Sequence, residues 1–154
     1  MSEETWSIGE VVAETGVPAS TLRYYEKIGI LGPIARGMQS KQREYTEDDV
    51  SRVHQLACLQ ALDLSLTQVR TYVAAMQGST TQDISTMVEL FAAQHAKVQA
   101  QQRLLAARAA YIDKKREYWR ARAAGDEAGA AAVVDEAEAL AQHLHAAYKA
   151  QQSL

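Results

Sequence analysis

One short stretch near the N-terminus carries side chains suited to binding an anion. Residues 15–31 read TGVPASTLRYYEKIGIL, with hydroxyl, phenol and cationic groups between a proline and a glycine. The donors that a helix would bring near one face are Ser20, Thr21, Arg23, Tyr24 and Lys27. Leu22 and Tyr25 would fall towards the other side, with Leu22 in the core. Because such donors bind phosphate oxygens, the pattern favours contact with nucleic acid over an ordinary surface helix.

Basic charge is confined to this part of the chain. The whole sequence has 154 residues and a formal charge of −3. Between Ser20 and Tyr45, five cations stand against Glu26 and Glu44, which gives a local charge of +3. The cations are Arg23, Lys27, Arg36, Lys41 and Arg43. The acidic flanks hold Glu3, Glu4, Glu10 and Glu14 before them, and Glu47, Asp48 and Asp49 after them. This distribution argues for a local basic patch and against a uniformly basic coat.

Two short helices around a glycine-containing turn should position these donors. A capping box at residues 7–10 begins a first helix, which ends at Gly16. Pro18 suits the first turn of a second helix, which reaches Ile28 and stops at Gly29. Two such helices across a short turn form a helix-turn-helix pattern.

The following segment predicts a small β-hairpin and two more helices. Short strands at residues 34–36 and 43–45, around the polar loop of residues 37–42, would make a two-stranded wing. Capping pairs at residues 46–49 and 65–68 begin a third and a fourth helix, and Gly78 ends the fourth.

A long helix is predicted from Thr80 to about Arg122, since this segment contains neither proline nor glycine. Apolar residues recur along it at every seventh position: Ile84, Phe91, Val98, Leu105, Ile112 and Trp119. A seven-residue repeat is typical of a coiled-coil seam, although the companion row is partly polar. Such a helix would be roughly 60 Å long, more than a small domain can cover, so a second copy of the chain is the expected partner.

The C-terminal segment is expected to form a further helix. Gly125 and Gly129 loosen the chain, and an alanine-rich amphipathic segment of residues 130–152 follows. The predicted organisation is a mainly α chain in three parts. These are a winged helix-turn-helix domain at residues 1–78, an antiparallel coiled-coil dimerisation helix at 79–122, and a helical effector or capping segment at 123–154.

The order of these elements and three matching stretches resemble the MerR family of bacterial transcriptional regulators. The stretches are WSIGEVVAETGVPASTLRYYEKIGIL at residues 6–31, REYTEDDV at 43–50 and LDLSLTQV at 62–69. The resemblance covers residues 6 to about 122. It implies a homodimer that binds double-stranded promoter DNA, places a recognition helix in the major groove, and distorts the promoter for RNA polymerase. Members of the family act as activators or repressors.

The resemblance also implies which residues contact DNA. Those on the recognition helix are Ser20, Thr21, Arg23, Tyr24 and Tyr25, and Arg43 and Tyr45 match the wing and its base. Arg36 is a second expected wing contact, and Lys27 joins the set from the basic helix face. Lys41-Gln42 stands where many members have a Gly-Tyr pair before the wing arginine, and Lys41 is expected to replace a neutral DNA contact with a charged one.

Two kinds of signal remain open. Cys58 is the only cysteine, and its position and the YIDKKREYW ending of the coil resemble the branch that responds to aldehydes and other electrophiles. His54 lies one turn earlier and would favour the thiolate, whereas a lone cysteine on a helix is more often a small buried residue. The alternative is a small molecule bound among aromatic residues: Tyr111, Tyr118, Trp119 and Tyr148.

Other classes of protein are disfavoured. The segments that hold cysteines in metal-sensing members have none here, and His143 and His145 point in different directions on a helix. We therefore expect no metal and no cofactor. The sequence shows no phosphate-binding glycine loop and no catalytic triad or carboxylate pair, so an enzyme is not expected. The lone cysteine, an acidic start and the lack of a long apolar run fit a cytoplasmic, nucleoid-associated protein without a membrane segment. A constitutive architectural DNA-binding protein of the excisionase type is the alternative function.

Overall fold

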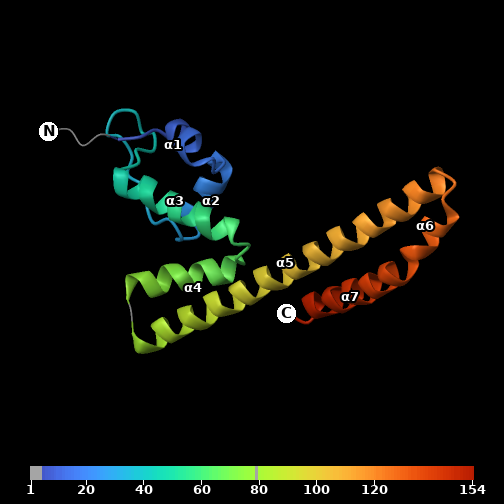
Figure 1. Cartoon of the computed structure of the whole chain (residues 1–154). Helices are drawn as coiled ribbons and strands as arrows, with labels where there is room; N and C mark the ends of the chain where they lie inside the picture. The colour runs from blue at the N-terminus through green and yellow to red at the C-terminus, as the bar shows by residue number, and fades with distance from the viewer. Residues whose placement is uncertain (1–4, 79) are drawn as a thin grey trace. The chain divides into compact units, whose positions relative to one another are not determined.

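The structure, a computed structural model, describes residues 5–78 and 80–154. It is mainly helical, as predicted, and divides into two compact units, one ending at Leu90 and the other running from Phe91 to Leu154 (Figure 1). Glu3 and Glu4 of the acidic flank, and Ser79 between the fourth helix and the long helix, lie outside the described residues.

The first unit begins with the two predicted short helices. Helix α1 (Ile8–Thr15) is capped by Ser7, whose hydroxyl accepts a hydrogen bond from the Glu10 amide, and the glutamate carboxylate accepts one from the Ser7 amide at 2.7 Å. Gly16 ends α1 with a φ of 71°, a left-handed conformation that glycine adopts at little cost. Helix α2 (Ala19–Lys27) follows Pro18. The end of α1 and the start of α2 therefore agree with the sequence prediction to within one residue.

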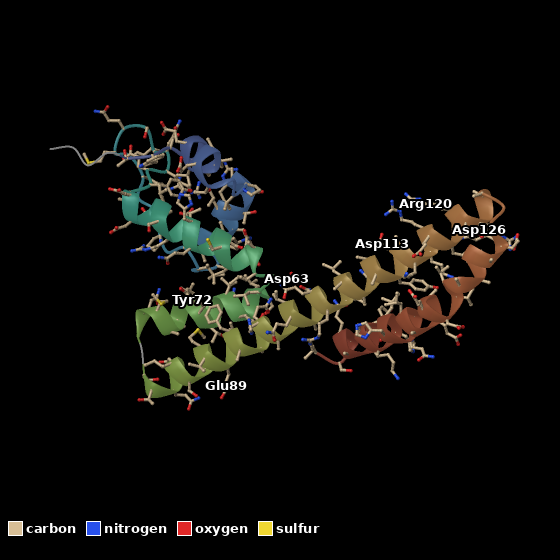
Figure 2. All side chains as sticks on the ribbon, in the orientation of Figure 1. Asp63, Tyr72, Glu89, Asp113, Arg120 and Asp126 are labelled. Carbon is tan, nitrogen blue, oxygen red and sulfur yellow. The ribbon has the colours of Figure 1, made fainter. Side chains whose placement is uncertain are left out.

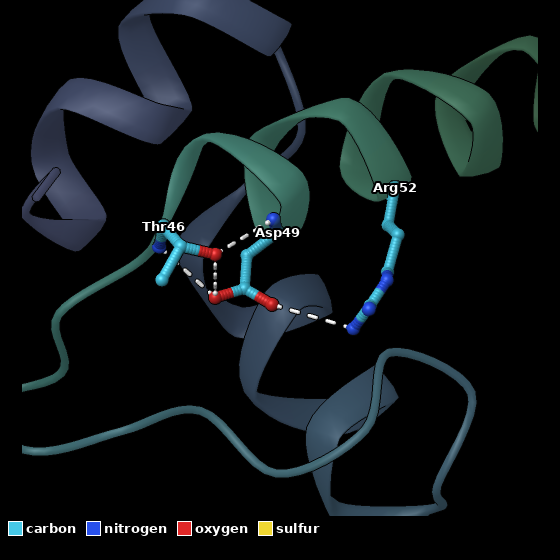
Figure 3. Close-up of polar contacts among 3 residues, drawn as sticks. All are labelled: Thr46, Asp49 and Arg52. Atoms are coloured by element: carbon cyan, nitrogen blue, oxygen red, sulfur yellow. Dashed lines mark hydrogen bonds and ion pairs between the residues drawn. The ribbon is translucent and has the colours of Figure 1, made fainter. Parts of the chain in front are cut away.

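Helices α3 (Glu47–Ala61) and α4 (Leu66–Gln77) also begin at their predicted capping boxes. Figure 3 shows the first of these: Thr46 and Asp49 exchange hydrogen bonds at the start of α3, and the other carboxylate oxygen of Asp49 lies 3.5 Å from Arg52. Asp63 takes a left-handed φ of 59° in the turn between the two helices (Figure 2). These local signals fix where each helix starts.

A single apolar core joins α1 to α4. Its fully buried members are Val11, Leu22, Tyr45 and Val53, one from each of α1, α2, the segment before α3, and α3 itself. Leu22 is the residue predicted to anchor the second helix, and it is 0% exposed. Burying it fixes which face of α2 turns outward.

The predicted two-stranded wing is not formed. Residues 34–36 and 43–45 are joined by one isolated antiparallel bridge between Arg36 and Arg43, with hydrogen bonds from Gly37 to Gln42 and from Glu44 to Ala35. The ladder stops there because Tyr45 pairs its backbone with Trp6 instead, at 2.8 and 2.9 Å. We call residues 35–44 the wing loop.

The long helix α5 (Thr81–Ala123) is continuous over 43 residues and begins within one residue of the predicted start. Thr80 caps it through hydrogen bonds with Asp83. The last segment is two helices rather than one. Helix α6 (Glu127–Ala132) is capped by Asp126 (Figure 2), and the chain turns at Val133 into α7 (Val134–Gln152). Ala130, Val133 and Ala137 are all buried around this turn.

Within the second unit, α7 runs back alongside α5 (Figure 1). An ion pair joins them, with Lys114 Nζ 2.6 Å from the Glu136 carboxylate and 2.9 Å from that of Glu117. The two carboxylates raise the pKa of Lys114 above its ordinary value of 10.5, since both stabilise the ammonium form. The terminal segment thus folds back along α5.

Candidate nucleic-acid interface

Helix α2 has one buried and one exposed face. Leu22 and Tyr25 are 0% and 7% exposed, whereas Tyr24 is 47% exposed and lies with the polar residues. Ser20, Arg23 and Lys27 of the predicted set are exposed as well, and Thr21 is half-buried beside them. The helix therefore presents hydroxyl, guanidinium, phenol and ammonium donors from one side, as the sequence predicted.

Tyr25 belongs to the inner face. Its phenolic oxygen accepts a hydrogen bond from the side-chain amide of Gln60 on α3, and its ring lies 6.3 Å from that of Tyr24. This contact is tertiary, so sequence reasoning missed Gln60. The structure gives Tyr25 the role of fixing α2 on the core.

The wing loop holds its cations at the surface. Arg36 and Lys41 are exposed, and Arg36 Nη1 donates to the Lys41 carbonyl at 3.3 Å. Lys41 has a φ of 56°, which places it in the left-handed region that non-glycine residues seldom adopt. This is the position where the sequence departs from the family pattern, and the departure lies at a strained turn.

Arg43 forms an ion pair with a residue of α2. Its Nε donates to the Glu26 carboxylate at 2.5 Å, and the two side chains are only 23% and 17% exposed. Sequence reasoning counted Glu26 merely as an opposing charge, because no local pattern links position 26 on a helix to position 43 in a loop.

Tyr45 is not at the surface. It is 0% exposed, and its hydroxyl finds no hydrogen-bond partner in the described part of the chain. Burial raises the pKa of the Tyr45 phenol, because the phenolate would be poorly solvated there. We therefore correct the expectation that Tyr45 contacts DNA: the structure makes it a core residue beneath the wing loop.

Three of the predicted cations line one groove. An open groove of about 580 Å³ runs beside α2, and Arg23, Lys27 and Arg43 line it together with Glu26. The remaining lining comes from the turn after α2 and from Gln77. The net positive charge of these side chains makes the groove suited to an anion.

The predicted seam of α5 is exposed in the single chain. Its residues are exposed by 38% to 64%, namely Ile84, Phe91, Val98, Leu105, Ile112 and Trp119. The buried residues of α5 are instead Gln94, Ala100, Leu104 and Ala107. A regular apolar row on the outside of one chain is characteristic of an interaction surface.

The candidate signal-binding residues fall into separate places. Cys58 is exposed on α3, so it is not the small buried residue that its helix position favoured. The His54 imidazole lies 3.8 Å from Glu14, which gives it a partner on α1.

In the second unit, aromatic residues gather between α5 and α7. Tyr111, Tyr118 and Trp119 line a groove of about 460 Å³ with Lys115, Glu138 and the apolar residues of α7. The Tyr118 and Trp119 rings meet edge to face at 5.2 Å, and Lys115 Nζ lies 5.3 Å from the Tyr111 ring centre. Tyr148 is 46% exposed and does not line this groove. The structure thus brings three of the four predicted aromatics together.

Within residues 5–78 and 80–154, no set of three or more histidine, cysteine, aspartate or glutamate side chains is arranged to hold a metal ion. None of the helices in these residues has the length and apolarity that crossing a membrane requires.

Comparison with known proteins finds a family match within the first unit. Residues 6–76 match the model of the MerR HTH family regulatory proteins. Nodulation protein NolA from Bradyrhizobium elkanii is 40% identical over 75 residues, which are 49% of this chain and 32% of NolA. The HTH-type transcriptional regulator AdhR from Bacillus subtilis is 33% identical over 66 residues, or 43% of this chain and 46% of AdhR.

A solved structure extends the likeness beyond that domain. HiNmlR, a MerR family regulator that lacks the sensor domain and was crystallised bound to promoter DNA, aligns with a TM-score of 0.61 and 26% identity. The alignment covers 85% of this chain and 96% of HiNmlR. A MerR family regulator from Listeria monocytogenes shares the fold at a TM-score of 0.59 and 23% identity, over 75% of this chain and 86% of the other.

The curated relatives are longer than the match. The chain spans about a third of NolA and less than half of AdhR. The helix-turn-helix geometry, the exposed donor face of α2 and the family match all concern the same residues. The chain therefore carries, over residues 6–76, a helix-turn-helix domain of the MerR family of regulatory proteins.

Proposed function

We propose that this chain is a transcriptional regulator that binds promoter DNA as a homodimer and responds to a small molecule or an electrophile. The observation that carries the proposal is the exposed face of α2, where Ser20, Arg23 and Lys27 stand opposite the buried Leu22. In a helix-turn-helix domain, the second helix enters the major groove with such a face. The likeness to HiNmlR, which was crystallised on promoter DNA, supports the same role here.

The proposed contacts divide between base edges and backbone. Ser20, Thr21 and Arg23 are the side chains on α2 best able to reach base edges, while Tyr24 and Lys27 donate to phosphates. Arg36, Lys41 and Arg43 of the wing loop add phosphate contacts. Tyr25 and Tyr45 support this surface from the core.

Dimerisation rests on the exposed row of α5. Val98, Leu105 and Ile112 are 40%, 60% and 56% exposed, and they are spaced by seven residues on one helix. A second α5 packed antiparallel on this row would remove it from water, which is the main driving force for association. A dimer would also present two copies of α2 to two half-sites of one operator.

Regulation would act through the shape of the DNA. Bending and untwisting a promoter costs about a few kcal/mol of deformation free energy, and the contacts between the dimer and the DNA must offset this cost. A signal that changes how the two domains are held would change that balance and so the access of RNA polymerase. Activation and repression are both outcomes of this scheme.

Two sites are proposed for the signal. Cys58 is exposed, so its sulfur is accessible to an aldehyde. The sulfur would add to the carbonyl carbon, and the thiol proton would move to the carbonyl oxygen. The groove of Tyr111, Tyr118 and Trp119 is the second site, suited to a flat apolar molecule. His54, one turn before Cys58 on α3, is the residue that we propose completes this first site.

The excisionase-type alternative has less support. An architectural protein needs the winged domain, but it does not need a 43-residue helix with an exposed apolar row, or the α6 and α7 helices that follow it. The alignment with HiNmlR also extends over 85% of this chain, beyond the DNA-binding domain.

A binding titration tests the proposal. Purified protein is titrated into a labelled fragment of its own promoter and into a scrambled fragment of equal length, at several salt concentrations. We expect saturable, salt-sensitive binding that prefers the promoter. Equal binding to both fragments supports the architectural alternative, and no binding to either contradicts both.

A further inference from the structure

The ion pair between Glu26 and Arg43 links the two parts of the candidate interface. Glu26 lies on α2 and Arg43 on the wing loop, 17 residues apart in sequence. Among the ion pairs in the described part of the chain, it alone has both side chains less than a quarter exposed, at 23% for Arg43 and 17% for Glu26. A negative charge in this place is unexpected on a surface that binds a polyanion, because it would repel DNA.

The geometry of the pair leaves the arginine able to bind a second group. Glu26 takes the Nε hydrogen, which is one of the five N–H donors of a guanidinium group. The two Nη groups make no further hydrogen bond in the described residues. A planar guanidinium held at Nε therefore keeps a two-nitrogen fork free for an oxyanion.

The guanidinium group of Arg43 lies in a groove that other cationic side chains also line. Arg43 and Glu26 line the same groove as Arg23 and Lys27, and the groove has a volume of about 580 Å³. Three cations and one carboxylate leave it positively charged. A groove with this charge is suited to a phosphate group.

We infer that Glu26 is a positioning residue, which holds the Arg43 guanidinium beside α2 so that it binds the same stretch of phosphate backbone as Arg23 and Lys27. The inference rests on the proposed DNA-binding function and adds the residue that orients one of its contacts. Fixing the guanidinium before DNA arrives removes the cost of ordering a long side chain during binding. The gain outweighs the repulsion that the carboxylate adds, because its charge is already matched by Arg43.

The test is whether removing the negative charge of Glu26 weakens or strengthens DNA binding. Glu26→Gln removes a negative charge and keeps the shape of the side chain, so simple electrostatics would tighten DNA binding. We expect the opposite, a loss of about tenfold, which corresponds to one charge-assisted hydrogen bond. Glu44→Gln is the matched control. It makes the same charge change next to Arg43, at a carboxylate that lies against Gly37 and not on the arginine, and should bind as tightly as the wild type or more tightly.

A double-mutant cycle assigns the effect to Arg43. In an Arg43→Ala background, Glu26→Gln should no longer weaken binding, because there is no guanidinium left to position. The salt dependence gives a separate readout: both Glu26→Gln and Arg43→Ala should lower the slope of log affinity against log salt by about 0.9, the value for one phosphate contact. Circular dichroism establishes that each variant is folded at the temperature of the titration.

If Glu26→Gln does not fold, Glu26→Asp takes its place. The shorter side chain keeps the charge and cannot reach Nε, so it should weaken binding with no change of net charge. Binding by Glu26→Gln, or by Glu26→Asp where it is used, as tight as that of the wild type overturns the inference, and so does a loss that persists in the Arg43→Ala background. A wild-type protein that binds no DNA at all removes the proposed function itself, and the inference with it.

Discussion

The side-chain amide of Gln60 on α3 donates a hydrogen bond to the phenolic oxygen of Tyr25 on α2, across 35 positions of sequence. Tyr25 is 7% exposed, and its neighbour Tyr24 is 47% exposed. The contact fixes the rotation of α2, so that one tyrosine of the adjacent pair faces the core and the other faces outward with Arg23 and Lys27.

Tyr25→Phe should destabilise the first unit. The change removes the acceptor of the Gln60 amide and leaves the apolar ring in place, so the free energy of unfolding should fall by about 1 kcal/mol. Urea denaturation followed by circular dichroism measures it. Gln60→Ala should have a similar effect, and the double variant should lose little more than either single one. Fully additive losses would show that the two groups do not interact.

Tyr45→Phe should have the opposite sign. The Tyr45 hydroxyl is buried without a hydrogen-bond partner in the described residues, and such a group costs about 1 to 3 kcal/mol. Removing it should raise the free energy of unfolding by about 1 kcal/mol. The same urea titration decides the sign, and a loss as large as that of Tyr25→Phe would show that the hydroxyl is satisfied in solution.

The row on α5 should control the oligomeric state. Val98→Asp or Leu105→Asp places a charge in the proposed dimer interface, where burying it would be costly. Light scattering should then give a lower mass than for the wild type. Ala106→Asp is the control, because Ala106 is exposed beside Leu105 but off the row. An unchanged mass for the first two variants would place the interface elsewhere.

Cys58 should be needed for a response to electrophiles. In a promoter reporter challenged with an aldehyde, Cys58→Ser should abolish the change in expression, because a serine hydroxyl is a far weaker nucleophile than a thiolate. Binding of the variant to DNA without the aldehyde should be unchanged. A variant that still responds would direct attention to the Tyr111, Tyr118 and Trp119 groove, where an aromatic ligand should alter Trp119 fluorescence.

Acid should weaken the cap of α1. Hydrogen bonds from the Ser7 amide and hydroxyl hold the pKa of the Glu10 carboxyl below its usual value of 4.5. The unfolded chain therefore takes up this proton first, so the stabilisation is present above pH 4.5 and is lost as the pH falls through the lower folded-state pKa. Thermal melting between pH 6 and pH 3, as an approximate range about that pKa, should show a steeper loss for the wild type than for Glu10→Gln. Parallel losses would contradict this role of Glu10.

The sequence predicts the helices well because their start signals are local. Ser7 with Glu10, Thr46 with Asp49 and Ser65 with Gln68 each bond within one turn, so the spacing alone locates them. Exposure of Ser20, Arg23 and Lys27 was also predictable, since Leu22 sets the inner face of α2.

What the sequence did not predict is tertiary. The wing was expected to form two paired strands. The backbone of Tyr45 instead forms hydrogen bonds with that of Trp6, a residue 39 positions earlier, so the pairing between the two wing segments ends after one bridge. The same segment buries Tyr45 and brings Arg43 to Glu26. No local spacing encodes these pairings, because each depends on how the first four helices pack around one core.

The salt dependence of promoter binding by Arg23→Ala tests the central claim most directly. If the exposed face of α2 binds DNA, removing this guanidinium should weaken binding and lower the slope of log affinity against log salt by about 0.9. Arg70→Ala is the control for the loss of one positive charge, since Arg70 is exposed on α4 and outside the proposed contact set. An Arg23→Ala variant with the affinity and slope of the wild type would show that α2 does not bind the DNA.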